Sequence, residues 1–235
     1  MLRGEATVVQ LIIACGLFLG IHFFVSGTAL RGVIVGRIGE GPYQAVYSLV
    51  SIGALAWLIW AYGAAPVVPL WDRHVVLDWI ALIVMLPAVV LFVAGLTTRN
   101  PTSVGQGKVL KDDNPAVGIV KLTRHPFLWA VALWGLAHVL VNGDGASLVL
   151  FGGLALLALV GSRSIDAKRA KRDPEAWARF SAVTSWLPFA AIAQGRASLS
   201  LGEIGWWRLL LGLVLYALLV SGLHLLVFGV SALPV

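Results

Sequence analysis

Three histidines, His22, His138 and His224, lie inside long apolar stretches of this sequence. An ionisable side chain in a lipid-embedded helix is costly unless a partner satisfies it, so such a residue indicates a functional site. The same stretches hold no acidic residue except at their ends, which disfavours a hard metal ion or a proton relay. Neutral imidazoles facing an apolar cavity suit haem iron, because the iron needs two axial nitrogens and the macrocycle needs apolar walls. The alternative for each ring is a hydrogen bond to a neighbouring main-chain carbonyl.

The depth of each histidine in its helix predicts which two can meet. His138 lies roughly 18 Å into a helix that starts at Pro126, and His224 lies roughly 22 Å into one that starts at Leu209. Both helices start at the same face of the membrane, so these two rings are level. His22 lies only about 6–12 Å from that face. Spacing alone therefore favours His138 with His224 over His138 with His22.

A second group of chemically capable residues precedes Pro126. Arg124 and His125 stand at the mouth of that helix, and the later segments 173–180 and 186–189 add Glu175 and several aromatic residues. An arginine and a histidine beside an acid and aromatics suit an anionic, adenosine-bearing cofactor. The alternative is interfacial anchoring at lipid headgroups. Glycine-rich phosphate loops, HExxH and serine-elbow motifs are absent from the sequence.

The elements that position these residues are membrane helices. The chain has 235 residues, of which 59% are hydrophobic and 12% charged, and its mean hydropathy is +0.91. A soluble domain has about 25% charged residues, so most of this chain belongs in lipid. A helix needs about 20 residues to cross a bilayer, and six uncharged runs reach or approach that length: 6–26, 43–64, 79–98, 126–141, 146–162 and 209–229.

The basic residues predict the orientation of these runs. Of the 17 lysines and arginines, 15 fall in the segments after the first, third and fifth runs, and only Arg3 and Arg73 fall on the other side. The positive-inside rule places the 15 in the cytoplasm and both termini outside. The net charge of +6 therefore reflects cytoplasmic loops, and we expect no nucleic-acid partner. A single cysteine, Cys15, excludes an intramolecular disulfide and a cysteine-based metal cluster.

The fold class expected is an all-α integral membrane protein, a bundle of about six transmembrane helices in one domain, 1–235. Segment 180–194 is apolar but too short to span and is interrupted by Pro188. We expect an interfacial or re-entrant segment over about 163–205. A seventh span is the alternative, and it would move the C-terminus inside.

Four ordered blocks of sequence resemble the NnrU family over nearly the whole chain: LGIHFFVSGTALR, RIGEGPYQAVYSLVS, LTRHPFLWAVALWGLAHVLVNGD and LGEIGWWRLLLGLVLYALLVSGLHLLVFGVSALP. That family is associated with denitrification. The resemblance implies a protein of the cytoplasmic (inner) membrane that supports nitrite and nitric oxide reduction. Its implied partners are the lipid bilayer, a small hydrophobic ligand and reductase subunits.

The NnrU family is in turn similar to 15-cis-zeta-carotene isomerase, a membrane haem b enzyme in which redox-switched iron ligation drives a cis–trans isomerisation. This resemblance implies haem b here, with His22 and His138 as ligands. It favours His22 where the depth estimate favours His224, so all three histidines are candidate metal ligands. The isomerase has a cysteine three residues before the second histidine, as alternative ligand, where this chain has Gly135.

A second resemblance is to isoprenylcysteine carboxyl methyltransferases. It rests on Arg124-His125-Pro126 and on the later stretch from Glu175 to Phe189. It implies that Arg124 and His125 bind S-adenosylmethionine. Three functions thus stay open: a haem-dependent redox or isomerase-like protein, a membrane methyltransferase, and a non-catalytic assembly factor for a reductase.

Overall fold

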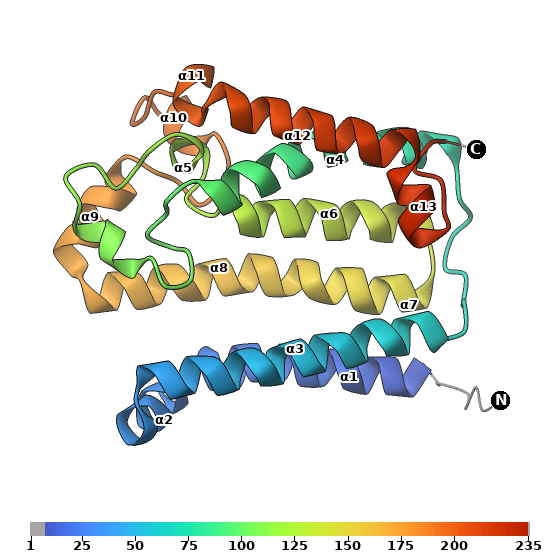
Figure 1. Ribbon diagram of the computed structural model, residues 1–235, viewed down its shortest axis with the longest axis horizontal. Helices are drawn as coiled ribbons and strands as arrows, with labels where there is room; N and C mark the ends of the chain where they lie inside the picture. The colour runs from blue at the N-terminus through green and yellow to red at the C-terminus, as the bar shows by residue number, and fades with distance from the viewer. Residues whose placement is uncertain (1–7, 235) are drawn as a thin grey trace.

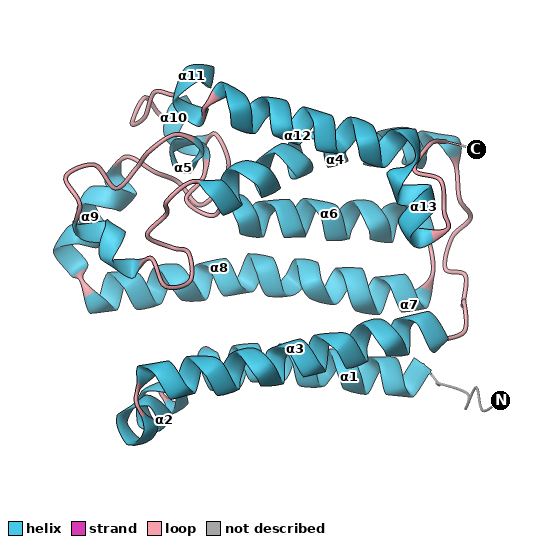
Figure 2. Cartoon of the chain, viewed as in Figure 1, coloured by secondary structure: helices cyan, strands magenta, loops and turns pink. Residues whose placement is uncertain are grey.

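The computed structural model describes residues 8–234, and every regular element in that range is helical, apart from one isolated bridge between Pro69 and Asp144 (Figures 1 and 2). Within this range, five helices are long and apolar enough to cross a membrane: Val8–Ser26, Glu40–Ala64, Val75–Thr97, Gly145–Arg172 and Trp206–Phe228. The helix Pro126–Asn142 is apolar but shorter. The prediction of an all-α, multi-pass membrane protein is confirmed. Arg3 and the start of the first expected run, residues 6 and 7, lie outside the described residues.

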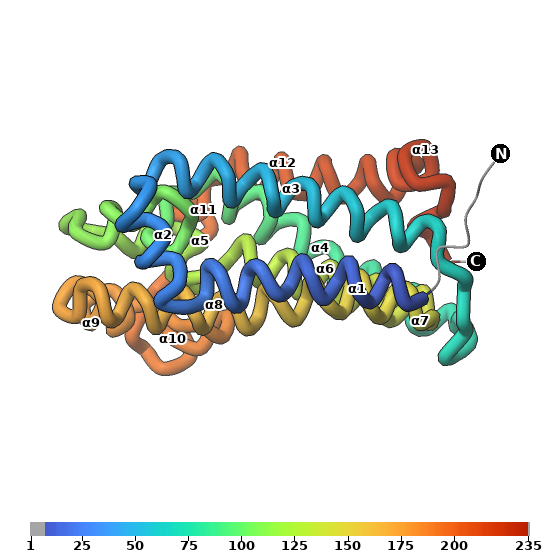
Figure 3. The backbone as a smooth tube through the Cα atoms, turned by 90° about the horizontal axis from the view of Figure 1, so that it is seen from below, coloured from blue at the N-terminus to red at the C-terminus, as the bar shows by residue number. Residues whose placement is uncertain are grey.

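The apolar helices run alternately up and down the bundle (Figures 1 and 3). In chain order the apolar helices are α1 (Val8–Gly20), α3 (Glu40–Ala64), α4 (Val75–Thr97), α6 (Pro126–Asn142), α8 (Gly153–Arg172) and α12 (Trp206–Leu218). Three of them are continuous with π-helical segments. Helix α1 leads into η1 (Ile21–Ser26), α8 is preceded by α7 (Gly145–Ser147) and η3 (Leu148–Gly152), and α12 is followed by η4 (Leu219–Leu223) and α13 (His224–Phe228). Helix α6 packs between α4 and α8, and α12 packs on α4. The α1–α3 pair attaches mainly through η3. The short helix α6 is therefore flanked on both sides by longer helices.

The short elements gather at one end of the bundle, on the left in Figures 1 and 2. They are α2 (Leu30–Ile38), η2 (Gly107–Lys111), α5 (Ile119–Leu122), α9 (Pro174–Ala182), α10 (Ala190–Ala193) and α11 (Leu201–Ile204). We call this the basic end, because the 15 clustered lysines and arginines lie in or beside these elements. The opposite end, which carries α7 and α13, is called the distal end.

Residues 173–205 form a cap on the basic end. They contain only α9, α10 and α11, so no described helix there is long enough to span. Phe180 and Ala191 are fully buried, and Phe180 joins an apolar core with Ile119, Val120 and Ala94. The expected short, Pro188-interrupted segment therefore folds onto α5 and the ends of the long helices. The interfacial or re-entrant segment was expected to start at about residue 163. Because α8 continues to Arg172, the cap begins only at residue 173.

Two boundaries change which polar residues lie inside helices. Helix α4 begins at Val75, four residues before the expected start, so Asp78 lies in its first turn and is buried. The last expected run is interrupted rather than continuous, because the backbone leaves helical geometry at Gly222 (φ 159°, ψ −18°). Large apolar side chains such as Leu49, Ile83 and Leu210 point outward along the bundle, where a membrane helix contacts lipid.

Candidate functional site

A cavity of about 120 Å³ lies near the distal end, between α4, α6 and the α12–α13 region. Its wall is mainly apolar and includes Met85 and Val89 of α4 and Val220 of η4. His138 and His224 both line it, and their ring centroids are 6.3 Å apart. The depth estimate from the sequence, which placed these two rings at one level, is confirmed.

Hydrogen bonds set the tautomer of both rings. The Nδ1 of His138 lies 2.8 Å from the carbonyl oxygen of Trp134, and the Nδ1 of His224 lies 2.8 Å from that of Val230. Because a carbonyl oxygen only accepts, each Nδ1 carries the proton and each Nε2 keeps a lone pair. Neither Nε2 has a hydrogen-bond partner among residues 8–234. The alternative given for each ring, a hydrogen bond to a main-chain carbonyl, is therefore met in both. Such a bond is also one of the supports found for metal-ligating histidines.

Breaks in regular helix geometry bring the two rings together. Gly222 bends the last helix immediately before α13, so His224 starts a new direction. On the other side, Phe151 of η3 stacks on His138, with centroids 4.7 Å apart and an interplanar angle of 27°. Trp134 contacts the same imidazole at 5.0 Å. Single-turn π segments occur frequently at functional sites, and here one flanks each ring.

An ion pair at the edge of the cavity was not expected from the sequence. Arg73 donates from Nε to both carboxylate oxygens of Asp78, at 3.0 and 3.2 Å, and both residues line the cavity. The expected apolar run started just after Asp78, which left this carboxylate outside the helix. The sequence does contain a signal for a buried Asp78, because the apolar residues Val75 and Val76 precede it and already belong to α4.

His22 lies away from the other two intramembrane histidines. It belongs to η1, which leads into α2 at the basic end, whereas His138 is near the α7 end of α6 (Figures 1 and 3). Its Nδ1 donates to the carbonyl oxygen of Phe18 at 2.7 Å, and its ring contacts Phe18 and Tyr47. The structure thus brings together His138 and His224, and not the pair His22 and His138 that the isomerase resemblance implied.

Arg124 and His125 converge on Asp166 of α8, a residue the sequence analysis did not single out. Arg124 Nε donates to Asp166 Oδ2 at 2.9 Å, and His125 Nε2 lies 2.6 Å from Oδ1. Arg124 also lies over the ring of Trp177 in the cap, 5.3 Å from its centroid. His125 is only 2% exposed. The group therefore clamps the cap to α6 and α8, and its binding of an adenosine cofactor stays a prediction.

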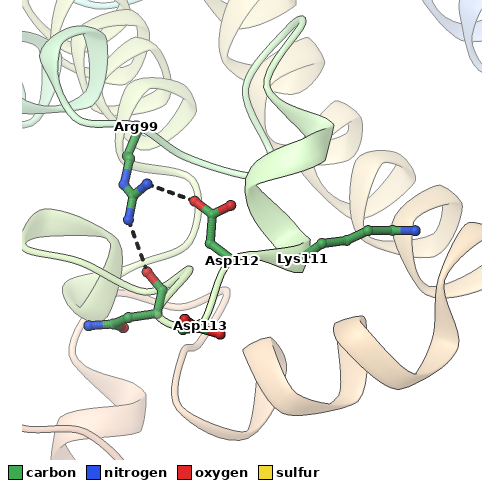
Figure 4. Close-up of a pocket in the computed structure, with 5 residues that line it drawn as sticks. Arg99, Lys111, Asp112 and Asp113 are labelled. Carbon is green, nitrogen blue, oxygen red and sulfur yellow. Dashed lines mark hydrogen bonds and ion pairs between the residues drawn. The ribbon is translucent and has the colours of Figure 1, made fainter.

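A second cavity, of about 530 Å³, is a hollow in the loop after α4 (Figure 4). Arg99 donates to Asp112 at 2.7 Å, while Lys111 points away from them. Asp113 and Asn114 complete its lining. Because these charged groups pair with one another or face outward, the hollow offers no convergent set of ligands.

Comparisons with known proteins bear on the histidine site. A protein-family model described as "NnrU protein" matches residues 10–232. Two chloroplastic 15-cis-zeta-carotene isomerases are similar over a third of this chain: that of Zea mays is 37% identical over 82 residues, and that of Arabidopsis thaliana is 38% identical over 79. The chain spans 22% of the length of each of these relatives. No solved structure matches.

Proposed function

The chain belongs to the NnrU family, and we propose that it is a haem-binding membrane protein of redox or isomerase-like function. His138 and His224 would hold the haem iron. The protein supports the reduction of nitrogen oxides from the cytoplasmic membrane. The likeness to 15-cis-zeta-carotene isomerase, in a segment covering a third of the chain, supports the isomerase-like part.

The observation that carries this proposal is the spacing of the two rings in one cavity. With metal–nitrogen bonds of about 2.0–2.1 Å, two imidazoles on opposite sides of one ion have ring centres roughly 6 Å apart. The observed separation is 6.3 Å, and both Nε2 lone pairs are free of hydrogen bonds within the described residues. This separation would allow both rings to reach one metal ion, which supports His138 and His224 as the residues that would hold it.

The volume of the cavity bears directly on this proposal. Pockets for drug-sized ligands and cofactors measure about 300–1,000 Å³, whereas this one measures about 120 Å³. As it stands, the cavity is too small to enclose a whole haem macrocycle.

The residues of the chain have definite tasks at this site. The carbonyl oxygens of Trp134 and Val230 hold each proton on Nδ1, so that Nε2 can act as the ligand. Phe151 holds the plane of the His138 ring. When bound, haem supplies one-electron chemistry and an iron whose axial ligation can be exchanged.

Thiolate ligation has no place in this proposal. Gly135 stands where the isomerase has its cysteine, and a Cβ added there would lie 2.6 Å from the carbonyl oxygen of Phe151. The absence of a side chain at Gly135 allows α6 and η3 to pack closely.

An absorption spectrum of the detergent-purified protein, supplied with haem and then separated from unbound haem, tests the proposal. We expect a Soret band that His138→Ala and His224→Ala each abolish and that His22→Ala leaves unchanged. His22→Ala is the matched control, because it removes an intramembrane histidine with the same Nδ1–carbonyl bond. A colourless wild type overturns the proposal. A band that depends on His22 but not on His224 overturns this choice of ligands.

A further inference from the structure

Four cations lie within five residues at the end of α8, beyond its apolar part: Lys168, Arg169, Lys171 and Arg172. None of the four forms an ion pair with an acidic residue within residues 8–234. The neighbouring Asp173 lies 3.6 Å from Lys111 instead. The helix dipole favours cations at this end of a helix, but it provides no counter-ion.

The segment formed by η1 and α2 brings a further cation to the same place. Lys168 of α8 donates from Nζ to the carbonyl oxygen of Ser26, the last residue of η1, at 2.6 Å. Arg31, in the first turn of α2, lies close enough for its charge to act on both Lys168 and Arg169. Arg172 acts on Arg169 in the same way. We call Arg31, Lys168, Arg169 and Arg172 the α2–α8 cation cluster.

The carboxylates of the basic end do not balance this cluster. The cation at the mouth of α6, Arg124, has a carboxylate partner in Asp166. In the cluster, the one carboxylate that forms an ion pair within the described residues is Glu40, and its partner is Arg31. Four positive charges against one negative charge leave a net charge of +3. Because like charges held together repel one another, and because Arg31 and Arg169 are partly buried, the cluster calls for an external anion.

Exposed apolar side chains adjoin the cluster on the side of the membrane span. Phe24 of η1 is 71% exposed and lies two residues before Ser26. Val160 of α8 is 45% exposed and precedes Lys168 by roughly 12 Å along the helix. An anion bound at the cluster therefore has an apolar surface beside it. A phospholipid with an anionic headgroup supplies a phosphate and apolar chains in one molecule, and basic groups between membrane helices are typical sites for such headgroups.

We propose that the α2–α8 cation cluster binds the phosphate of an anionic phospholipid, whose acyl chains lie along η1 and α8. The α1–α3 pair attaches to the rest of the bundle mainly through η3. A phosphate held between α2 and α8 joins this pair to the bundle at the basic end as well (Figure 1). The site is separate from the cavity of His138 and His224, and it does not depend on the proposed haem.

Thermal unfolding in an uncharged detergent, with added dioleoyl phosphatidylglycerol, tests this site. We expect saturable stabilisation of the wild type. The apparent affinity for the lipid should be roughly fivefold weaker in Lys168→Gln and in Arg169→Gln, as expected for the loss of one basic residue beside an anionic lipid. Arg169→Lys, which keeps the charge, should respond nearly as the wild type does. Arg179→Gln is the matched control, because Arg179 is an exposed cation of α9 without an ion pair in the described part of the chain.

The stability in detergent alone separates binding from packing. Without the lipid, Arg169→Gln should unfold no earlier than the wild type, because the loss of one cation relieves repulsion in the cluster. Earlier unfolding of Arg169→Gln, together with an unchanged response to the lipid, would make Arg169 a packing residue and overturn the site. An equal loss of response in Arg179→Gln would assign the effect to the overall charge of the basic end, which also overturns it.

Comparison compounds separate the sources of the phosphate. Dioleoyl phosphatidylcholine has the same acyl chains and no net charge, and equal stabilisation by it would contradict recognition of an anion. Inorganic phosphate at the same concentration lacks the acyl chains, so equal stabilisation by it would replace the lipid with a soluble anion. We expect neither compound to match phosphatidylglycerol. The Soret band should be unchanged in Arg169→Gln, so this proposal and the proposed function fail separately.

Discussion

Asp166 is the residue on which the charges at the mouth of α6 converge. It accepts from Arg124 and pairs with His125, two groups that lie more than 40 positions earlier in the chain. Its side chain and that of Arg124 are each 15% exposed, and that of His125 is 1% exposed. Removal of one member of a buried group leaves the others without a partner, which costs more than the loss of a surface pair.

We therefore predict that Asp166→Asn lowers the free energy of unfolding by about 3 kcal/mol. Equilibrium unfolding in mixed micelles measures this. Asp112→Asn is the control, since its pair with Arg99 is exposed and such pairs contribute at most about 1 kcal/mol. Equal effects of the two variants would contradict the clamp.

Gly135 gives a second prediction at the scale of single residues. Gly135→Ala should destabilise the protein by about 1–3 kcal/mol, because the new Cβ would meet the carbonyl oxygen of Phe151 at 2.6 Å. In Gly161→Ala the new Cβ meets nothing within 4 Å, so that helix should gain about 0.5–1 kcal/mol. The difference in unfolding free energy between the two variants is the measurement. If Gly135→Ala proved neutral, α6 and η3 would not be in close contact.

At the scale of elements, three π-helical segments distinguish this bundle. One contains His22, one contains the Phe151 that stacks on His138, and one ends immediately before His224. A regular helix would carry each of these side chains in a different direction. The segments therefore aim the rings, and the break at Gly222 has the largest consequence because it turns a whole element, α13.

Gly222→Ala should move His224 away from the cavity. A side chain rarely adopts φ near 159°, so the last helix should straighten and the bond from His224 Nδ1 to Val230 should be lost. The ¹⁵N resonances of labelled histidines report this change, with His138 as the internal reference. Gly53→Ala is the control, because that glycine has open space around it. Unchanged His224 resonances would show that Gly222 does not position α13.

At the scale of the whole molecule, charge divides the bundle into two unlike ends. The 15 clustered lysines and arginines lie in or beside the elements of the basic end, whereas Arg73 lines the cavity near the distal end. Helix α1 begins at the distal end, where the C-terminal segment also lies (Figure 1). The positive-inside rule predicts that the basic end faces the cytoplasm, and an even number of crossings would then place both ends of the chain outside.

Reporter fusions test this topology. Alkaline phosphatase joined after Leu233 should be active, and joined after Asp113 it should be inactive, because the enzyme folds only outside the cytoplasm. A fluorescent protein at the same two positions should give the reverse pattern. The same result at both junctions would mean that α6, the shortest of the apolar helices, does not complete a crossing.

The sequence by itself determined the class of fold, the approximate helices, the asymmetry of charge and the equal depth of His138 and His224. These follow from local hydropathy and from a fixed rise per residue, which need no knowledge of neighbours. Only the tertiary structure decided that Asp166 joins Arg124 to His125, that Asp78 lies inside α4, and that His22 stands apart beside Tyr47. These contacts depend on how each helix is rotated about its axis and where it bends. Such rotations and bends result from packing between segments distant in the chain.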